Sequence, residues 1–133
     1  MPTEYLKPAG LANSPAYSHV AVATGRRTIY ISGQVSVDES GAVVGAGDLG
    51  AQTTQVMKNL GAALAAAGAG FADVVKITTY IVNYKPEDRA VVGAARSAAF
   101  AGRASPPAST LVGVQALAAP EWMIEIEAIA VLD

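Results

Sequence analysis

Two acidic residues lie two positions apart in an otherwise apolar segment near the end of the chain. Glu125 and Glu127 alternate with apolar residues over residues 124–128. On a β-strand such residues point to the same side, with Cα atoms about 6.5–7 Å apart. A carboxylate in a pocket can orient a water molecule or accept a proton. The alternative is a solvated sheet face, or acids paired with arginine across an interface, and the pattern alone favours this simpler interpretation.

A second candidate group ends an apolar segment in the first third of the chain. It is Ser32-Gly33-Gln34. A glycine at a strand end lets a ligand approach the backbone, and adjacent amides can bind an anion or a carbonyl. An isolated Ser-Gly pair is also typical of a plain β-bulge or bend, which is the more economical interpretation.

Two neighbouring hydroxyl side chains, Ser109 and Thr110, follow the rigid segment Pro106-Pro107-Ala108. A nucleophilic serine needs a base within reach, and His19 is the sole histidine of the chain. The sequence does not place His19 beside Ser109, and no G-x-S-x-G motif surrounds this serine. We therefore expect these hydroxyls to form hydrogen bonds rather than to attack a substrate.

The composition excludes several kinds of chemistry. There is no cysteine, which excludes thiolate catalysis and cysteine-ligated metals, and one histidine cannot form a histidine-rich metal site. Residues 45–50 have the spacing G-x-G-x-x-G, but the preceding apolar segment is too short for a dinucleotide-binding strand and no ribose-binding acid follows. We expect a turn there, with Asp48 as a helix cap, and neither a metal nor a cofactor.

Length and charge set the broad class. The 133 residues predict one domain spanning residues 1–133, and a net charge of −2 argues against a nucleic-acid partner. Charged residues make up 15% of the chain, below the usual share of about 25%. A chain with so few charged residues leaves apolar surface exposed as a monomer, which indicates that part of the exterior is covered in an oligomer. With no apparent secretion signal or membrane span, we expect a cytoplasmic protein.

These candidate residues require a scaffold, and the hydrophobic pattern predicts one. Residues 1–13 are expected to form an irregular arm. Strands are predicted over 19–23 and 28–32, joined as a hairpin, with a second hairpin or short return over 35–44. Helices are predicted over 49–67 and 86–101, and strands over 73–83, 107–116 and 121–132. This order predicts an α+β fold in which two helices cover one face of a mixed sheet and self-association hides the other.

Several of these segments together resemble the RidA (YjgF) family of reactive intermediate deaminases. The resemblance covers about residues 14–132 and rests on Tyr17 after a proline, the Ile-Ser-Gly-Gln segment at 31–34, Ala51-Gln52-Thr53, residues 74–78, Pro107-Ala108 and residues 124–130. It implies a chorismate-mutase-like fold and a homotrimer whose sheets face inward, with three clefts between subunits. It also implies hydrolysis of enamines or imines such as 2-aminoacrylate to ketoacids and ammonia.

The resemblance also implies a set of site residues and one departure. Tyr17, Ser32, Gly33 and Glu125 match positions of the family's ligand pocket. Ala108 is a further candidate for ligand binding, and Glu125 is the candidate to orient water. The family's arginine after Pro-Ala, which grips the substrate carboxylate, is replaced here by Ser109.

Three functions follow from this departure. One is a divergent imine or enamine deaminase, or another hydrolase, without the ordinary 2-aminoacrylate activity, in which Ser109 or Thr110 binds polar groups. The second is a trimer that binds a small ligand without turnover, and the third and weakest is a ribonuclease.

Overall fold

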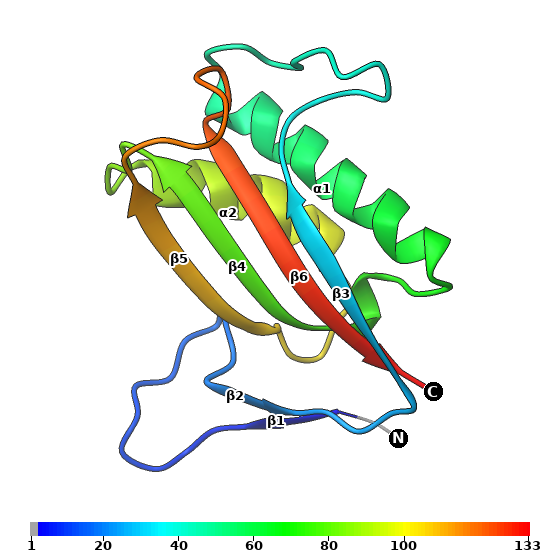
Figure 1. The fold of residues 1–133 in the computed structure, drawn as a ribbon. Helices are drawn as coiled ribbons and strands as arrows, with labels where there is room; N and C mark the ends of the chain where they lie inside the picture. Colours follow the sequence, from blue (N-terminus) through cyan, green and yellow to red (C-terminus); the bar gives the residue numbers. More distant parts are fainter. Residues whose placement is uncertain (1–2) are drawn as a thin grey trace.

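The computed structural model describes residues 3–133, which form an α+β fold. Figure 1 shows a sheet with both long helices on one side and a small two-stranded ribbon beyond its lower edge. The elements in chain order are β1 (Glu4–Leu6), β2 (Val20–Val22), β3 (Arg27–Gln34), α1 (Leu49–Ala66), the short 3₁₀ helix η1 (Phe71–Asp73), β4 (Val74–Val82), α2 (Asp88–Ala99), β5 (Ala108–Val114) and β6 (Ile124–Leu132). No helix among residues 3–133 is long and apolar enough to cross a membrane.

The main sheet is mixed, as the sequence predicts. Its strand order is β3-β6-β4-β5, with β4 and β5 parallel and the other neighbours antiparallel. Helix α2 is the connection that the parallel pair β4 and β5 requires. The predicted mixed sheet with two helices on one face is therefore confirmed (Figure 1).

The core lies between the helices and one face of the two central strands. Alternate residues of β6 and β4 are buried there, because side chains alternate between the two faces of a strand. Helix α1 covers them with a stripe at helical spacing: Val56, Leu60 and Leu64, each 1% exposed or less. At its start the Asp48 side chain accepts a hydrogen bond from the Ala51 amide at 3.0 Å, which confirms the predicted cap.

The N-terminal segment differs from the prediction. Within the expected irregular arm, Glu4–Leu6 forms β1 and pairs antiparallel with β2, while residues 1 and 2 lie outside the described residues. The arm is held by a distant contact that no local pattern reveals: Arg103 Nη2 donates to the Tyr5 hydroxyl at 2.6 Å.

The predicted hairpin of residues 19–23 with 28–32 is wrong, because β2 and β3 belong to different sheets. β2 pairs with β1, whereas β3 pairs with the long apolar strand β6. Gly25 lies between them against the end of β6, where an added Cβ would be 2.8 Å from the Leu132 carbonyl oxygen. The second predicted hairpin is reduced to a short return with one bridge, Val37 to Val43.

The face of the sheet away from the helices carries a different set of residues. Tyr30 of β3 is 77% exposed there, and Val112 of β5 is also exposed. Glu125, Glu127 and Thr110 lie on the same face, because they alternate with residues that point into the core or toward α2. We call this surface the open face.

Candidate functional site

A β-bulge brings Gly33 against the Glu125 carboxylate. Ile31 pairs with Ala128 and Gln34 with Ile126, so that Ser32 and Gly33 together lie opposite one residue of β6. A Cβ placed on Gly33 would be 1.9 Å from Oε2 of Glu125. The carboxylate therefore occupies the space that any other residue at position 33 would fill.

The two acids of β6 have different surroundings. The Tyr80 hydroxyl donates a hydrogen bond to Oε1 of Glu127. Glu125 has no hydrogen-bond or ion-pair partner among residues 3–133. Of the two carboxylates considered from the sequence, Glu127 is engaged within the sheet and Glu125 can receive a water molecule or a ligand.

The contact with Glu127 changes the titration of Tyr80. The hydrogen bond, and then burial and the charges of both acids, raise the pKa of Tyr80 above its ordinary value of 10.0. Stabilisation from this pair is present below that value and is lost as the pH rises through the pKa of Tyr80 in the folded protein. A pH titration followed by tyrosinate absorbance, run on the wild type and on Tyr80→Phe, measures this pKa. The ionisation step that is missing in Tyr80→Phe should lie above pH 10. A missing step at or below pH 10 would contradict this assignment.

Ser109 and Thr110 point to opposite sides of the sheet. Ser109 pairs with Ile77 of the core face, and Thr110 with Thr78 of the open face. Lys76 Nζ donates to the Thr110 hydroxyl oxygen at 2.7 Å. Ser109 instead lines a cavity between β5 and α2. The two hydroxyls, adjacent in sequence, therefore belong to different surroundings.

The cavity beside Ser109, which we call the α2 pocket, has a volume of about 700 Å³. This size is within the range of small-molecule sites. Tyr17 lines the pocket because the next residue, Ser18, fixes its segment against β5. The Ser18 amide donates to the Pro107 carbonyl at 3.1 Å, and the Ser18 hydroxyl donates to the Pro106 carbonyl at 2.6 Å. Ala108 supports this loop, since it forms a parallel bridge with Ser18.

His19 is not part of the α2 pocket. Its Nε2 is hydrogen-bonded to the Ala12 carbonyl, and its ring packs edge-on against Tyr17 at a centroid distance of 5.2 Å. The sole imidazole of the chain is thus engaged outside the α2 pocket, with Ala12 and Tyr17. Among residues 3–133 there is no group of three histidine, cysteine or acidic side chains that could hold a metal ion.

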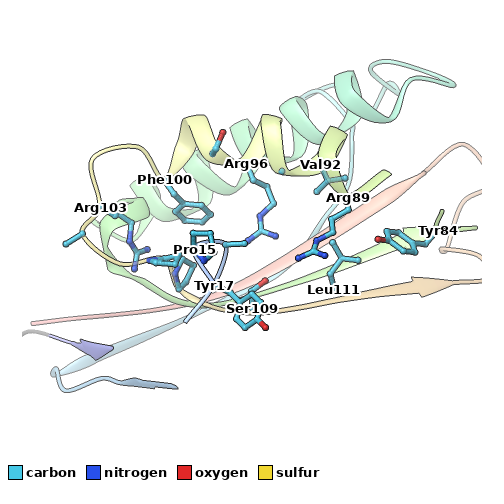
Figure 2. A pocket seen from close by; sticks show the side chains of 16 residues that line it. Pro15, Tyr17, Tyr84, Arg89, Val92, Arg96, Phe100, Arg103, Ser109 and Leu111 are labelled. Carbon is cyan, nitrogen blue, oxygen red and sulfur yellow. The ribbon is translucent and has the colours of Figure 1, made fainter. Parts of the chain in front are cut away.

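Three arginines line the α2 pocket, and none of them is among the site residues predicted from the sequence (Figure 2). Arg103 donates to the carbonyls of Ser105, Phe71 and Val74 and to Tyr5, so that it serves the fold. Arg89 and Arg96 extend from α2 toward β5. Their spacing of seven residues, about two helical turns, is the signal that would have placed both on one face of the predicted helix.

The candidate residues form two groups that one chain does not bring together. Glu125, Gly33 and the exposed Ser32 lie on or beside the open face. Tyr17 and Ser109 line the α2 pocket on the other side of β5. A site that uses both groups needs a second copy of the chain.

The chain is a small α+β protein whose candidate site residues lie in two separate groups. Comparison with known proteins identifies its family. The profile of the family described as Endoribonuclease L-PSP matches residues 9–132. A crystal structure from Yersinia pestis, described as a protein of unknown function of the conserved Rid protein family, is 44% identical, with a TM-score of 0.93 and coverage of 99% of this chain and 100% of that one. The chain belongs to the RidA (YjgF) family.

Two further relatives have more informative names. The 2-iminobutanoate/2-iminopropanoate deaminase of Rattus norvegicus is 38% identical over 87% of this chain and 80% of its own length. The structure of RidA from an Antarctic Psychrobacter is 32% identical, with a TM-score of 0.69 and coverage of 96% of this chain and 98% of that one.

Proposed function

We propose that this protein is a divergent imine or enamine hydrolase whose site is completed by a neighbouring copy of the chain. Glu125 and Gly33 of one copy would face Tyr17 and Ser109 of the next. The observation that carries the proposal is the Glu125 carboxylate, which lies against Gly33 and has no hydrogen-bond or ion-pair partner in the described part of the chain. The names of similar proteins, which include a 2-iminobutanoate/2-iminopropanoate deaminase, supply the reaction class.

The reaction needs one water molecule and no redox partner. The oxygen of water attacks the imine carbon, the nitrogen takes up protons, and the carbon–nitrogen bond breaks to leave a 2-oxo acid and ammonia. Glu125 is suited to orient the water and to receive its proton, because a carboxylate acts as an acceptor and a general base. Gly33 is suited to admit that carboxylate, because its missing side chain leaves the required space.

The open face supports assembly into a homotrimer. It carries the largely exposed Tyr30 and an exposed Val112 beside polar residues. The chain has few charges with which to solvate such a surface, since charged residues are 15% of the total. Burial of the open faces against each other would cover these side chains and bring the two groups of site residues into one cleft.

Ser109 is the reason to expect reduced activity on 2-aminoacrylate and on the short imines derived from it. An uncharged hydroxyl replaces a charge-assisted contact to the substrate carboxylate, a loss of about 1.5–3 kcal/mol in binding. Imines can be generated from amino acids by an amino-acid oxidase and trapped with semicarbazide, so that a hydrolase lowers the yield of semicarbazone. With the alanine-derived imine we expect little effect of the wild-type protein and a clear gain in Ser109→Arg.

Two results bear directly on this prediction. A wild-type rate on the alanine-derived imine equal to that of a relative carrying the arginine would contradict the role given to Ser109. If no imine from a panel of amino acids is hydrolysed faster with the protein, the hydrolase proposal fails.

The second candidate is a trimer that binds a small ligand without turnover. The α2 pocket favours it, because the pocket has the size of a ligand site while Glu125 lies on the other face of the same chain. Ligand binding without any hydrolysis across the panel would select this alternative. A ribonuclease has weaker support, because the net charge of −2 argues against a nucleic-acid partner.

A further inference from the structure

Arg96 is a half-buried cation without a counter-charge. Its Nε is buried and has no hydrogen-bond partner among residues 3–133. Its guanidinium carbon lies 6.0 Å from the centroid of the Phe100 ring, its one described contact of this kind. Burial lowers the pKa of Arg96, because removal from water disfavours the charged form. A guanidinium in this condition gains from any anion that reaches it.

The lining of the α2 pocket has one sign of charge. Sixteen of the described residues line it, of which three are arginines and none is acidic. The donors of Arg103 are used by backbone carbonyls and Tyr5, whereas Arg89 and Arg96 have no hydrogen-bond or ion-pair partner among residues 3–133. The pocket therefore presents an uncompensated positive potential to a ligand.

The position of Arg89 points to a ligand rather than to helix stability. It is the second residue of α2, near the positive end of the helix dipole, where a cation is unfavourable. Figure 2 shows its side chain reaching from α2 toward Leu111 and Ser109 of β5. A charge placed against the dipole and directed at the pocket is consistent with anion binding.

Gly93 leaves space between the two arginines. It lies on the same face of α2, four residues after Arg89 and three before Arg96, and lines the pocket. A Cβ added to Gly93 would meet nothing within 4 Å. Glycine inside a helix costs about 1 kcal/mol relative to alanine. The open volume beside Gly93 is thus accompanied by a lower stability of α2.

We propose that Arg96, assisted by Arg89, binds the carboxylate of a small monoanionic ligand from the α2 side of the pocket. The planar fork of a buried guanidinium matches a carboxylate bidentately. Val92, Phe100 and Leu111 line the same cavity and suit an apolar substituent on that ligand. The ligand class is therefore a 2-oxo or 2-imino acid with an apolar side chain, which rests on the proposed function for its reactive group.

Calorimetric titration with 4-methyl-2-oxopentanoate, a stable product analogue, tests this assignment. The wild-type protein should bind it, and Arg96→Met should raise Kd about tenfold to a hundredfold, because a charge-assisted contact is lost. Arg26→Met is the matched control, since it removes the same charge from an exposed turn and should leave Kd unchanged. Equal affinities in wild type and Arg96→Met would overturn the proposal.

Two further variants keep the test decisive if Arg96→Met folds poorly. Arg96→Lys keeps the charge without the fork and should bind more weakly than wild type. Gly93→Leu keeps both arginines but fills the open volume, and should abolish binding without lowering the unfolding midpoint. If both bind as tightly as wild type, the ligand lies elsewhere. Competition by inorganic phosphate as effective as that of the oxo acid would identify a general anion site and overturn the carboxylate assignment.

The outcome for this site is separable from that of the hydrolase proposal. Binding that depends on Arg96 without turnover of any imine would retain the anion site and reject the hydrolase. Imine hydrolysis that Arg96→Met leaves unchanged would retain the hydrolase and reject the anion site.

Discussion

Glu125→Gln is expected to reduce kcat for imine hydrolysis by about a hundredfold to ten-thousandfold, the usual contribution of a general base. The substitution keeps the size of the side chain and its place beside Gly33, and it removes the basic oxygen. The folded stability should change little, because the carboxylate has no described partner to lose. Steady-state kinetics on the most rapidly hydrolysed imine of the panel, with thermal unfolding as a check, measure both effects.

Glu127→Gln is the matched control for Glu125→Gln. The two acids share a strand and a face, but Glu127 is engaged by the Tyr80 hydroxyl. Its replacement should leave kcat within a fewfold of wild type. An equal loss in both variants would mean that the negative charge of this face matters, and not the base at position 125.

Gly33→Ala offers an independent approach to the same carboxylate. The added methyl group would lie 1.9 Å from Oε2 of Glu125, so the carboxylate must move and kcat should fall although both acids remain. Gly70→Ala is its control, because a Cβ there meets nothing within 4 Å. Full activity in Gly33→Ala would show that the position of the carboxylate is not critical.

Gln52→Ala is expected to lower the free energy of unfolding by about 3–5 kcal/mol, because several buried backbone groups lose their partners together. Gln52 is fully buried in α1. Its Nε2 donates to the carbonyls of Gly45 and Glu121 at 3.3 and 3.0 Å, and its Oε1 accepts from the amide of Met123 at 2.9 Å. One side chain thus joins α1 to the turn before it and to the segment that leads into β6.

Urea unfolding measures this loss, with Gln115→Ala as a control in an exposed loop. A surface substitution of this kind usually changes stability by less than about 0.5 kcal/mol. A loss below about 1 kcal/mol in Gln52→Ala would contradict the role of these hydrogen bonds.

The regular elements could be predicted from the sequence where local and tertiary preferences agree. The start of α1 follows from Asp48, and the alternation on β6 follows from the contrast between its isoleucines and its two glutamates. The N-terminal pairing could not be predicted, because β1 and β2 are joined across a loop of thirteen residues and the arm is held by Arg103. Local patterns favour the nearest partner strand, and here a distant strand, β6, is the partner of β3.

The site was only partly accessible to sequence reasoning. The contact between Gly33 and Glu125 joins residues far apart in the chain, and only the fold brings them together. The separation of Ser109 from Thr110 follows from the alternation of a strand, a signal that the sequence contained. The spacing of Arg89 and Arg96 was equally visible, but a charge on an exposed helix face usually has no function.

Mixed assemblies of two defective chains test most directly whether the site is shared between copies. Glu125→Gln lacks the base on the open face, and Gly93→Leu fills the α2 pocket. If the chain forms the proposed trimer and each site takes Glu125 from one copy and the pocket from the next, every mixed trimer contains one intact site. Equal co-expression should then restore about a quarter of wild-type imine hydrolysis. If mixed assemblies form, as native mass spectrometry would show, and hydrolysis stays at the level of the parent variants, the shared site is contradicted.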